Sequence, residues 1–201
     1  MHHATLPIGD GATSGAGADQ HTLVIPTVRD DLTVEGRTAL IVPVSGMGDA
    51  VETWRRRADP VAAGVPAHVT VLVPFLPLHR IDDSVRAWLA SAFAKVSMPR
   101  ELVFDQVRAF PTVVWLRPEL SDRFVELTEL VHRHWPECPP YEGQHETVIP
   151  HLTVAHGADV ERLVRLDLTP ELPITGRIGG VHLYAFTEGR WSDQAQFPFG
   201  D

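Results

Sequence analysis

Apolar residues between positions 38 and 199 follow two spacings, one typical of strands and the other typical of helices. Short runs rich in Val, Leu and aromatic residues predict strands at 38–44, 101–108, 113–116, 177–187 and 191–199, the last at a sheet edge. Two further strands are predicted around His68 and His151. Apolar residues three and four positions apart predict helices at 48–57, 82–96, 122–135 and 159–166. We expect Asp82 or Asp83 to cap the second helix, and Ser121 to cap the third.

The first 36 residues lack this periodicity. They are rich in Gly, Ala, Asp and Thr, which predicts a disordered or poorly ordered N-terminal tail with a short strand at 22–28. Residues 37–201 contain the same order of elements twice: strand, helix, loop, His-containing strand, helix and strand. We therefore expect one bilobal domain about a pseudo-two-fold axis, with lobes at roughly 37–110 and 111–201 that can exchange strands.

The tripeptide His-x-Thr occurs four times, and only two of the copies have the sequence context of a buried strand. His3 belongs to the Gly-rich tail, and the copy at His145 has Glu146 where a buried residue is needed. The copies at His68 and His151 each have an apolar middle residue, a β-branched residue after the Thr, and a proline shortly upstream. They also stand at equivalent places in the two halves, so we treat them as a matched pair.

Side chains alternate between the faces of a strand, so each motif presents an imidazole and a hydroxyl on one face. These are His68 and Thr70 in the first motif, and His151 and Thr153 in the second. Imidazole has a pKa near ~6.5, so one ring can take a proton from an attacking oxygen while the other protonates the leaving oxygen. The hydroxyls can donate hydrogen bonds to non-bridging phosphate oxygens. One such motif is more often structural, but two in matched places favour a phosphoester-cleaving site that needs no metal.

Other histidines and basic residues are weaker candidates. By strand parity, His156 is expected to face away from His151 and to be structural. The densest basic cluster is Arg55-Arg56-Arg57. Three consecutive side chains on a helix spread around its axis, so we interpret this cluster as a solvated face rather than a phosphate cradle.

Composition and charge narrow the class of partner. The 201 residues are 44% hydrophobic and 21% charged, which is ordinary for a globular protein with a sizeable core. No apolar run approaches the length of a membrane span, and the N-terminus lacks a signal-peptide pattern, so we expect a cytoplasmic protein without membrane contacts. The only cysteine, Cys138, precludes an internal disulfide. A net charge of −9 favours a small nucleotide or an RNA end over a long duplex as the ligand.

The motifs His68-Val-Thr-Val and His151-Leu-Thr-Val resemble the paired His-x-Thr-x motifs of the two-histidine phosphoesterase superfamily. The stretches HVTVLVPF and PHLTVAH are particularly similar to its bacterial 2′-5′ RNA ligase and cyclic phosphodiesterase branch, and the resemblance covers roughly residue 38 to the C-terminus. It implies an α+β fold of two lobes, each an antiparallel sheet with outer helices, around a central cleft. It also implies hydrolysis of 2′,3′-cyclic phosphates to 2′-phosphates, or cleavage and joining of 2′-5′ linkages. His68 and His151 would then be the acid–base pair, and Thr70 and Thr153 the phosphate donors.

Three functions are weighed on these grounds. The leading one is a cofactor-free, monomeric phosphodiesterase, in which Tyr141 of the Pro-rich loop before the second motif either stacks on a base or packs. The second is a non-catalytic binder of nucleotides or RNA ends at the same site. The third, a metalloenzyme built on the His-rich second half, is weakest, because His132 and His134 are two apart on a helix and do not share a face.

Overall fold

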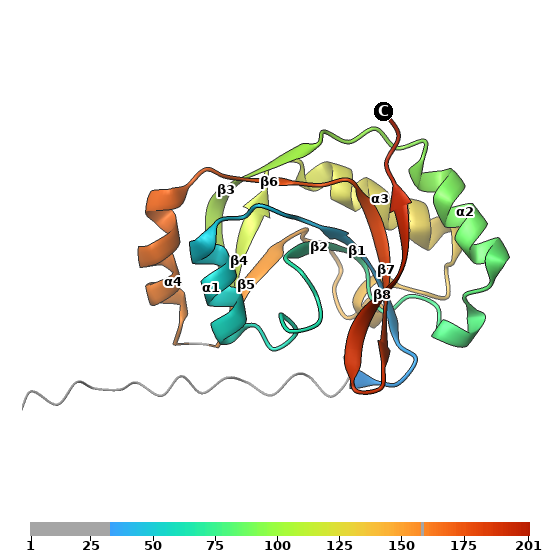
Figure 1. Ribbon diagram of the computed structural model, residues 1–201, viewed down its shortest axis with the longest axis horizontal. Helices are drawn as coiled ribbons and strands as arrows, with labels where there is room; N and C mark the ends of the chain where they lie inside the picture. The colour runs from blue at the N-terminus through green and yellow to red at the C-terminus, as the bar shows by residue number, and fades with distance from the viewer. Residues whose placement is uncertain (1–32, 158) are drawn as a thin grey trace, which may run out of the picture.

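The computed structural model describes residues 33–157 and 159–201, so the strand predicted at 22–28 lies outside the described residues. Within them the chain forms eight strands in one antiparallel sheet and four α-helices (Figure 1), which confirms the predicted α+β class. The strands are β1 (Thr38–Pro43), β2 (His68–Leu72), β3 (Glu101–Phe110), β4 (Val113–Pro118), β5 (Leu152–His156), β6 (Ile174–Arg177), β7 (Gly180–Thr187) and β8 (Arg190–Pro198). The helices are α1 (Asp49–Ala58), α2 (Asp83–Phe93), α3 (Ser121–His134) and α4 (Glu161–Leu168).

The sheet places strands from both halves of the sequence next to one another. Its order is β6-β3-β4-β5-β2-β1-β7-β8. Strand β3 thus lies with the strands of the second half, while β7 and β8 lie beside β1 and β2. Just past β1, Ser45 and Arg177 exchange backbone hydrogen bonds of 2.9 and 2.8 Å, which joins this end of β1 to β6 and curls the sheet. The two His-x-Thr strands, β2 and β5, are central neighbours.

The strand predicted at 177–187 is found as β7 from Gly180 to Thr187, but its predicted start is wrong, because Arg177 ends a separate strand, β6. β6 ends at Arg177 and pairs with β3, whereas β7 begins at Gly180 and pairs with β1 and β8. At Gly180 an added Cβ would lie 2.3 Å from the carbonyl oxygen of Phe197, so the close approach of β8 requires glycine there. The pair Gly179-Gly180 was therefore the signal that the apolar run is interrupted.

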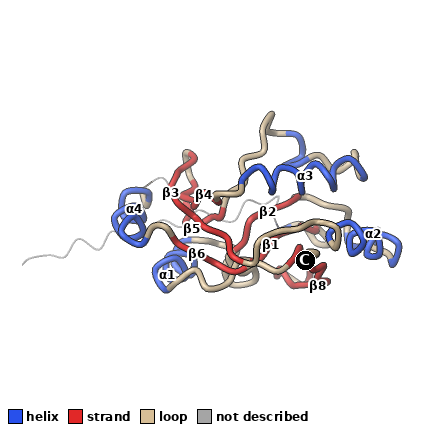
Figure 2. The backbone as a smooth tube through the Cα atoms, turned by 90° about the horizontal axis from the view of Figure 1, so that it is seen from above, coloured by secondary structure: helices blue, strands red, loops and turns tan. Residues whose placement is uncertain are grey.

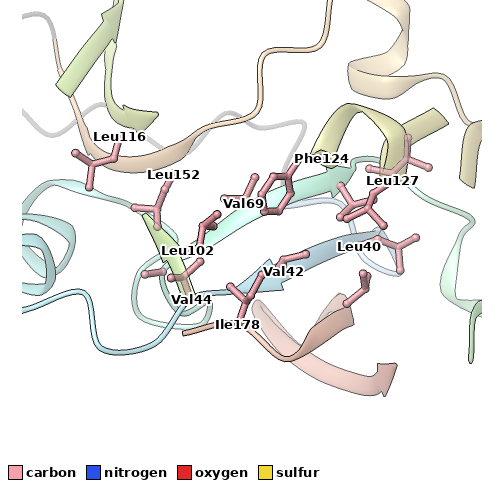
Figure 3. Close-up of a cluster of buried hydrophobic side chains, with 14 of the residues drawn as sticks. Leu40, Val42, Val44, Val69, Leu102, Leu116, Phe124, Leu127, Leu152 and Ile178 are labelled. Carbon is pink, nitrogen blue, oxygen red and sulfur yellow. The ribbon is translucent and has the colours of Figure 1, made fainter. Parts of the chain in front are cut away.

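One face of the sheet is buried under the helices. Val69 and Leu152, the middle residues of the two motifs, have no exposed surface and point into the same cluster as Phe124 and Leu127 of α3 (Figure 3). Burial of each such side chain stabilises the fold by roughly 1.5–3 kcal/mol. Figures 1 and 2 show α1 and α4 at one end of the sheet and α2 and α3 at the other. The apolar residues of the motifs therefore fix β2 and β5 from one face, and the motif histidines and threonines lie on the other, where β1 carries part of a second apolar cluster around Ile41.

The two predicted helix caps have different outcomes. Asp82 caps α2, because its Oδ1 accepts a hydrogen bond from the backbone N of Val85 at 2.9 Å. Ser121 is the first residue of α3 rather than its cap, and its hydroxyl donates to the carbonyl oxygen of Pro118 at 2.7 Å. The prediction for Ser121 is therefore wrong, since the hydroxyl donates to the preceding strand and does not accept from the helix.

Candidate active site

Strands β2 and β5 bring the two motifs side by side in the middle of the sheet. Val69 pairs with Leu152, and continuing this antiparallel register by one residue places each motif histidine opposite the threonine of the other motif. His68 and His151 are then diagonal neighbours, and such positions lie roughly 7–8 Å apart. All four motif side chains are half-buried, and strand parity places them on the face opposite the buried Val69 and Leu152. We call this side of the sheet the motif face.

Each imidazole is held by its own backbone, two residues upstream. Nδ1 of His68 lies 2.8 Å from the carbonyl oxygen of Pro66, and Nδ1 of His151 lies 2.8 Å from that of Ile149. A carbonyl oxygen can only accept a hydrogen bond, so Nδ1 carries the proton in both rings. Nε2 is therefore the nitrogen of each ring that can exchange a proton with a ligand.

Burial shifts both imidazoles toward the neutral form. It lowers the pKa of His68 to about 4, and the hydrogen bond to Pro66 opposes this shift. The charges of Arg55 and His151 lower the pKa of His68 further, while Asp59 raises it. Burial also lowers the pKa of His151, against the effect of its own backbone hydrogen bond. Both rings are thus neutral at pH 7 when no ligand is bound.

The segment that leads into β2 is held by a buried ion pair. Arg55, near the end of α1, is 2% exposed and donates from Nε and Nη2 to Oδ2 of Asp59 at 3.1 and 2.9 Å. The same Nη2 donates to the carbonyl oxygen of Val65 at 3.0 Å. The predicted solvated face is therefore right for Arg56 and Arg57, which are exposed, and wrong for Arg55. A carboxylate four positions on permits this guanidinium to be buried.

A β-bulge in β5 changes the face to which its last residue points. Val113 and Trp115 of β4, which share a face, pair with His156 and Thr153 of β5. Two residues lie between these partners on β5, where a regular strand has one, so β5 carries one extra residue. His156 therefore lies on the motif face with Thr153, and the prediction that it faces away from His151 is wrong.

Two aromatic rings of the β3–β4 hairpin contact the imidazole of His151. The ring centroids of Phe110 and Trp115 lie 5.2 and 5.8 Å from that of His151, and the two rings stack on each other at 5.0 Å. Trp115 is 4% exposed, and its Nε1 has no hydrogen-bond partner among the described residues. Sequence reasoning missed both rings because they come from a hairpin far from either motif. Their only signal was aromatic residues in and beside the predicted strand at 113–116.

Tyr141 lies against the first motif, although it precedes the second in the sequence. Its backbone N donates to the carbonyl oxygen of Val73 at 2.8 Å, and its side chain hydrogen-bonds that of Thr70. Burial raises the pKa of Tyr141 to about 12, which the Thr70 hydrogen bond opposes. Tyr141 and Glu142 have left-handed backbone angles (φ 51° and 58°), a conformation that costs about 1–2 kcal/mol per residue. An ion pair between Glu142 and Arg37 helps to hold this turn.

Three further observations delimit the site. No group of three or more His, Cys, Asp or Glu side chains within residues 33–157 and 159–201 is arranged to hold a metal ion. None of the helices in this part of the chain combines the length and the apolar character that a bilayer crossing needs. Two surface hollows are lined by residues 98–100, 178–179 and 199–201, and by residues 105–109, 165, 169 and 172. Neither hollow contains a motif residue, so the site is defined by the motif face.

Paired His-x-Thr strands at the centre of one antiparallel sheet are the arrangement expected of a two-histidine phosphoesterase. Residues 43–190, more than half of the 201 residues, match the model of the 2′-5′ RNA ligase superfamily. The chain belongs to this superfamily, which confirms the resemblance drawn from the two motifs.

Individual relatives agree with this assignment. A protein of Bacillus pumilus (strain SAFR-032) named "Putative phosphoesterase" is 27% identical over 123 residues, which cover 58% of this chain and 67% of that protein. A crystal structure from Thermus thermophilus matches with a TM-score of 0.52 and 17% identity, over 82% of this chain and 99% of that one. A crystal structure of a phosphoesterase gives 0.50 and 16%, over 84% and 100%. At such identities the structural matches show the fold alone.

Proposed function

We propose that this protein is a metal-independent phosphodiesterase that hydrolyses 2′,3′-cyclic phosphates, or cleaves or joins 2′-5′ phosphodiester bonds, by two-histidine acid–base catalysis. The observation that supports this most directly is the matched setting of His68 and His151. They lie on adjacent strands and on one face, each with Nδ1 bound to a carbonyl oxygen at 2.8 Å. Membership of the 2′-5′ RNA ligase superfamily supports the same chemistry.

In the proposed hydrolysis, Nε2 of one histidine takes a proton from water as the water oxygen forms its bond to phosphorus. Nε2 of the other gives its proton to the ribose oxygen as the old P–O bond breaks, so the two rings exchange protonation states. The hydroxyls of Thr70 and Thr153 donate to the non-bridging oxygens, where negative charge develops. Joining a 2′-5′ bond uses the same transfers with a ribose 5′-hydroxyl in place of water, and cleaving that bond runs them in reverse, so acid and base exchange roles between joining and cleavage.

The acid takes up its proton from solvent when the substrate binds. Burial keeps both imidazoles neutral at pH 7 in the ligand-free protein. A phosphate anion beside an imidazole favours the charged form of the ring and raises its pKa. We therefore expect a bell-shaped dependence of kcat on pH, in which both limbs belong to the coupled pair of histidines.

The surroundings of the motifs favour a small nucleotide or an RNA end as substrate. Arg108 pairs with Trp115 across the β3–β4 hairpin, so this exposed guanidinium lies on the motif face and can bind a second phosphate. Tyr141 adds an aromatic ring beside Thr70, in the role of a substrate-binding residue. With a net charge of −9, the chain lacks the broad positive field that a long duplex requires.

The test is an assay of the full chain on 2′,3′-cyclic nucleotides and a 2′-5′-linked dinucleotide, with product analysis and with or without a chelator. We expect 2′-phosphate products and no effect of the chelator. His68→Ala and His151→Ala should each lower kcat by roughly 10²–10⁴-fold. The exposed His79 offers a matched control, and His79→Ala should stay within about twofold.

Two results would overturn the proposal. One is activity that requires added metal or survives both histidine substitutions. The other is measurable nucleotide binding without turnover of any substrate in the panel, which would establish the alternative of a non-catalytic binder.

A further inference from the structure

We infer that the buried Arg55–Asp59 pair positions the imidazole of His68, so that these two residues act on the reaction through another side chain. This inference rests on the proposed function for its catalytic consequence, but its structural content can be tested without a substrate. It extends the site from the motif face to the end of α1 and the segment that follows it.

The contacts form a short chain from the ion pair to the ring. Nη2 of Arg55 reaches Oδ2 of Asp59 at 2.9 Å and the carbonyl oxygen of Val65 at 3.0 Å. The next carbonyl along the backbone, that of Pro66, accepts the hydrogen bond from Nδ1 of His68 at 2.8 Å. The guanidinium therefore fixes the peptide immediately before the carbonyl that orients the ring and keeps the proton on Nδ1.

The other end of the segment is tied to the same carboxylate. Oδ1 of Asp59 accepts a hydrogen bond from the backbone N of Val61 at 3.2 Å. Asp59 therefore holds the start of the loop between α1 and β2, and Arg55 holds its end at Val65. A buried ion pair brings little net stability over apolar residues of similar volume. What this pair adds is a fixed backbone conformation for the segment that leads from Val61 to His68.

The second motif has no equivalent of this pair within the described residues. The carbonyl that orients His151 belongs to Ile149, a residue that is 46% exposed. The ring of His151 instead contacts Phe110 and Trp115. Loss of the ion pair should therefore affect one histidine and spare the other, which makes His151 an internal reference.

Several charged groups face His68 and must be considered together. Arg55 and Asp59 approach it from the end of α1, and His151 approaches it from β5. Nε2 of His156, also on β5, lies 3.8 Å from Oδ1 of Asp59. Removing both Arg55 and Asp59 takes away charges of opposite sign, so the net charge beside His68 is unchanged. The double substitution therefore tests position rather than net electrostatics.

The experiment compares the full chain with the double variant Arg55→Met/Asp59→Asn, which leaves no unpaired charge in the interior. The fold supplies a control pair with the same bonding pattern at a more exposed place. On α4, Arg165 donates from Nε to Glu161 at 2.8 Å and from Nη1 to the carbonyl oxygen of Val107 at 2.7 Å, and it touches neither motif. The control variant is Arg165→Met/Glu161→Gln.

The first readout is the position of the ring protons, measured by long-range ¹H–¹⁵N correlation on protein labelled at histidine. In the wild-type chain we expect Nδ1–H for His68 and His151. In the double variant His68 should shift toward the Nε2–H form, while His151 keeps its proton on Nδ1. An unchanged His68 tautomer in the folded double variant would overturn the inference, whether or not the wild-type protein turns over any phosphodiester.

The second readout is steady-state kinetics on the best 2′,3′-cyclic nucleotide. We expect kcat of the double variant to fall roughly 10–100-fold with KM within about threefold, because a misplaced catalytic group loses transition-state stabilisation. The control pair should stay within about twofold. If the double variant does not fold, Arg55→Lys decides the matter. Its ammonium retains the charge beside Asp59 but cannot also span to Val65, so a wild-type tautomer and kcat would overturn the inference.

Discussion

The two motif histidines share a backbone setting but differ in what surrounds the ring. His68 sits beside the buried pair of Arg55 and Asp59, whereas His151 contacts the rings of Phe110 and Trp115. Each Nδ1 is nevertheless bound to a carbonyl oxygen two residues upstream, at 2.8 Å in both cases. The orientation of both rings is therefore set by the same backbone hydrogen bond, whereas the side chains that surround each ring differ between the two motifs.

Among the tests of this comparison, substitution of the threonines gives the largest expected effect, and it shows whether both halves bind the phosphate equally. Thr70→Val and Thr153→Val keep the shape and the strand propensity of the side chain but remove the hydroxyl donor. Each should lower kcat by roughly 10²–10³-fold, the usual cost of losing one donor to a developing oxyanion. Steady-state kinetics with both variants measures this. Equal losses of kcat would show that both threonines contribute equally to catalysis. A loss within twofold in either variant would remove that threonine from the proposed mechanism.

The free energy of unfolding should depend on pH through the lowered pKa of His68. Because its pKa is lowered to about 4, the unfolded chain binds a proton below pH ~6.5 that the folded chain binds only near pH 4. The neutral His68 ring therefore makes its full contribution to the free energy of unfolding above pH ~6.5, and this contribution is lost as the pH falls toward 4. Since the ring is half-buried, we expect a loss of roughly 1–3 kcal/mol in the free energy of unfolding.

Urea unfolding at several pH values between 7 and 4 checks this expectation. The decline should be shallower in His68→Gln than in the wild-type chain. Because burial also lowers the pKa of His151, His151→Gln provides the paired measurement in the other half. A decline of the same steepness in His68→Gln and the wild-type chain would contradict the depressed pKa of His68.

Truncation of Phe110 tests the aromatic side of the comparison. Phe110→Ala removes the edge-on contact with His151 and leaves the Pro66 and Arg55 contacts of the first motif in place. We expect kcat to fall about tenfold, since the ring of His151 gains freedom. The ¹⁵N signals of His68 should not move. A change at His68 comparable to that at His151 would show that the two surroundings are coupled.

The smallest expected effect belongs to Tyr141. Tyr141→Phe removes only the hydroxyl that hydrogen-bonds Thr70 and keeps the ring. We expect a change in KM of about two- to fivefold, with stability lower by about 1 kcal/mol, the usual net value of one hydrogen bond. Nucleotide titration and thermal unfolding measure these changes. A loss of kcat as large as that of Thr70→Val would show that Tyr141 acts in catalysis rather than in substrate binding alone.

The repeated elements and the matched motifs could be predicted from the sequence because both depend on short-range periodicity. Alternating burial along β2, with Val69 and Val71 inside, follows directly from the alternation of polar and apolar residues in the sequence. A cap at Asp82 or Asp83 is also a local signal, a carboxylate before an apolar helical pattern, and the structure shows that Asp82 is the cap. The repeat indicated that the two motif strands come together, but their direct antiparallel pairing in one sheet is known only from the structure.

The remaining features depend on contacts between distant segments. Arg55 is buried because Asp59 and the Val65 carbonyl meet it, and a basic run of three gives no sign of that. Phe110 reaches His151 only through the pairing of β4 with β5. The break between β6 and β7 lies at Ile178-Gly179, but both flanking runs are strand-like, so only the sheet order shows that they diverge.

The extra residue in β5 reverses the alternation of faces along the strand. Before it, odd-numbered residues such as His151 and Thr153 lie on the motif face, and after it the even-numbered His156 lies there. A chain shortened by one position at Ala155 would turn the third imidazole toward the apolar interior without changing any other letter. In this stretch, a one-position gap between two homologues therefore decides which side chain lies on the motif face.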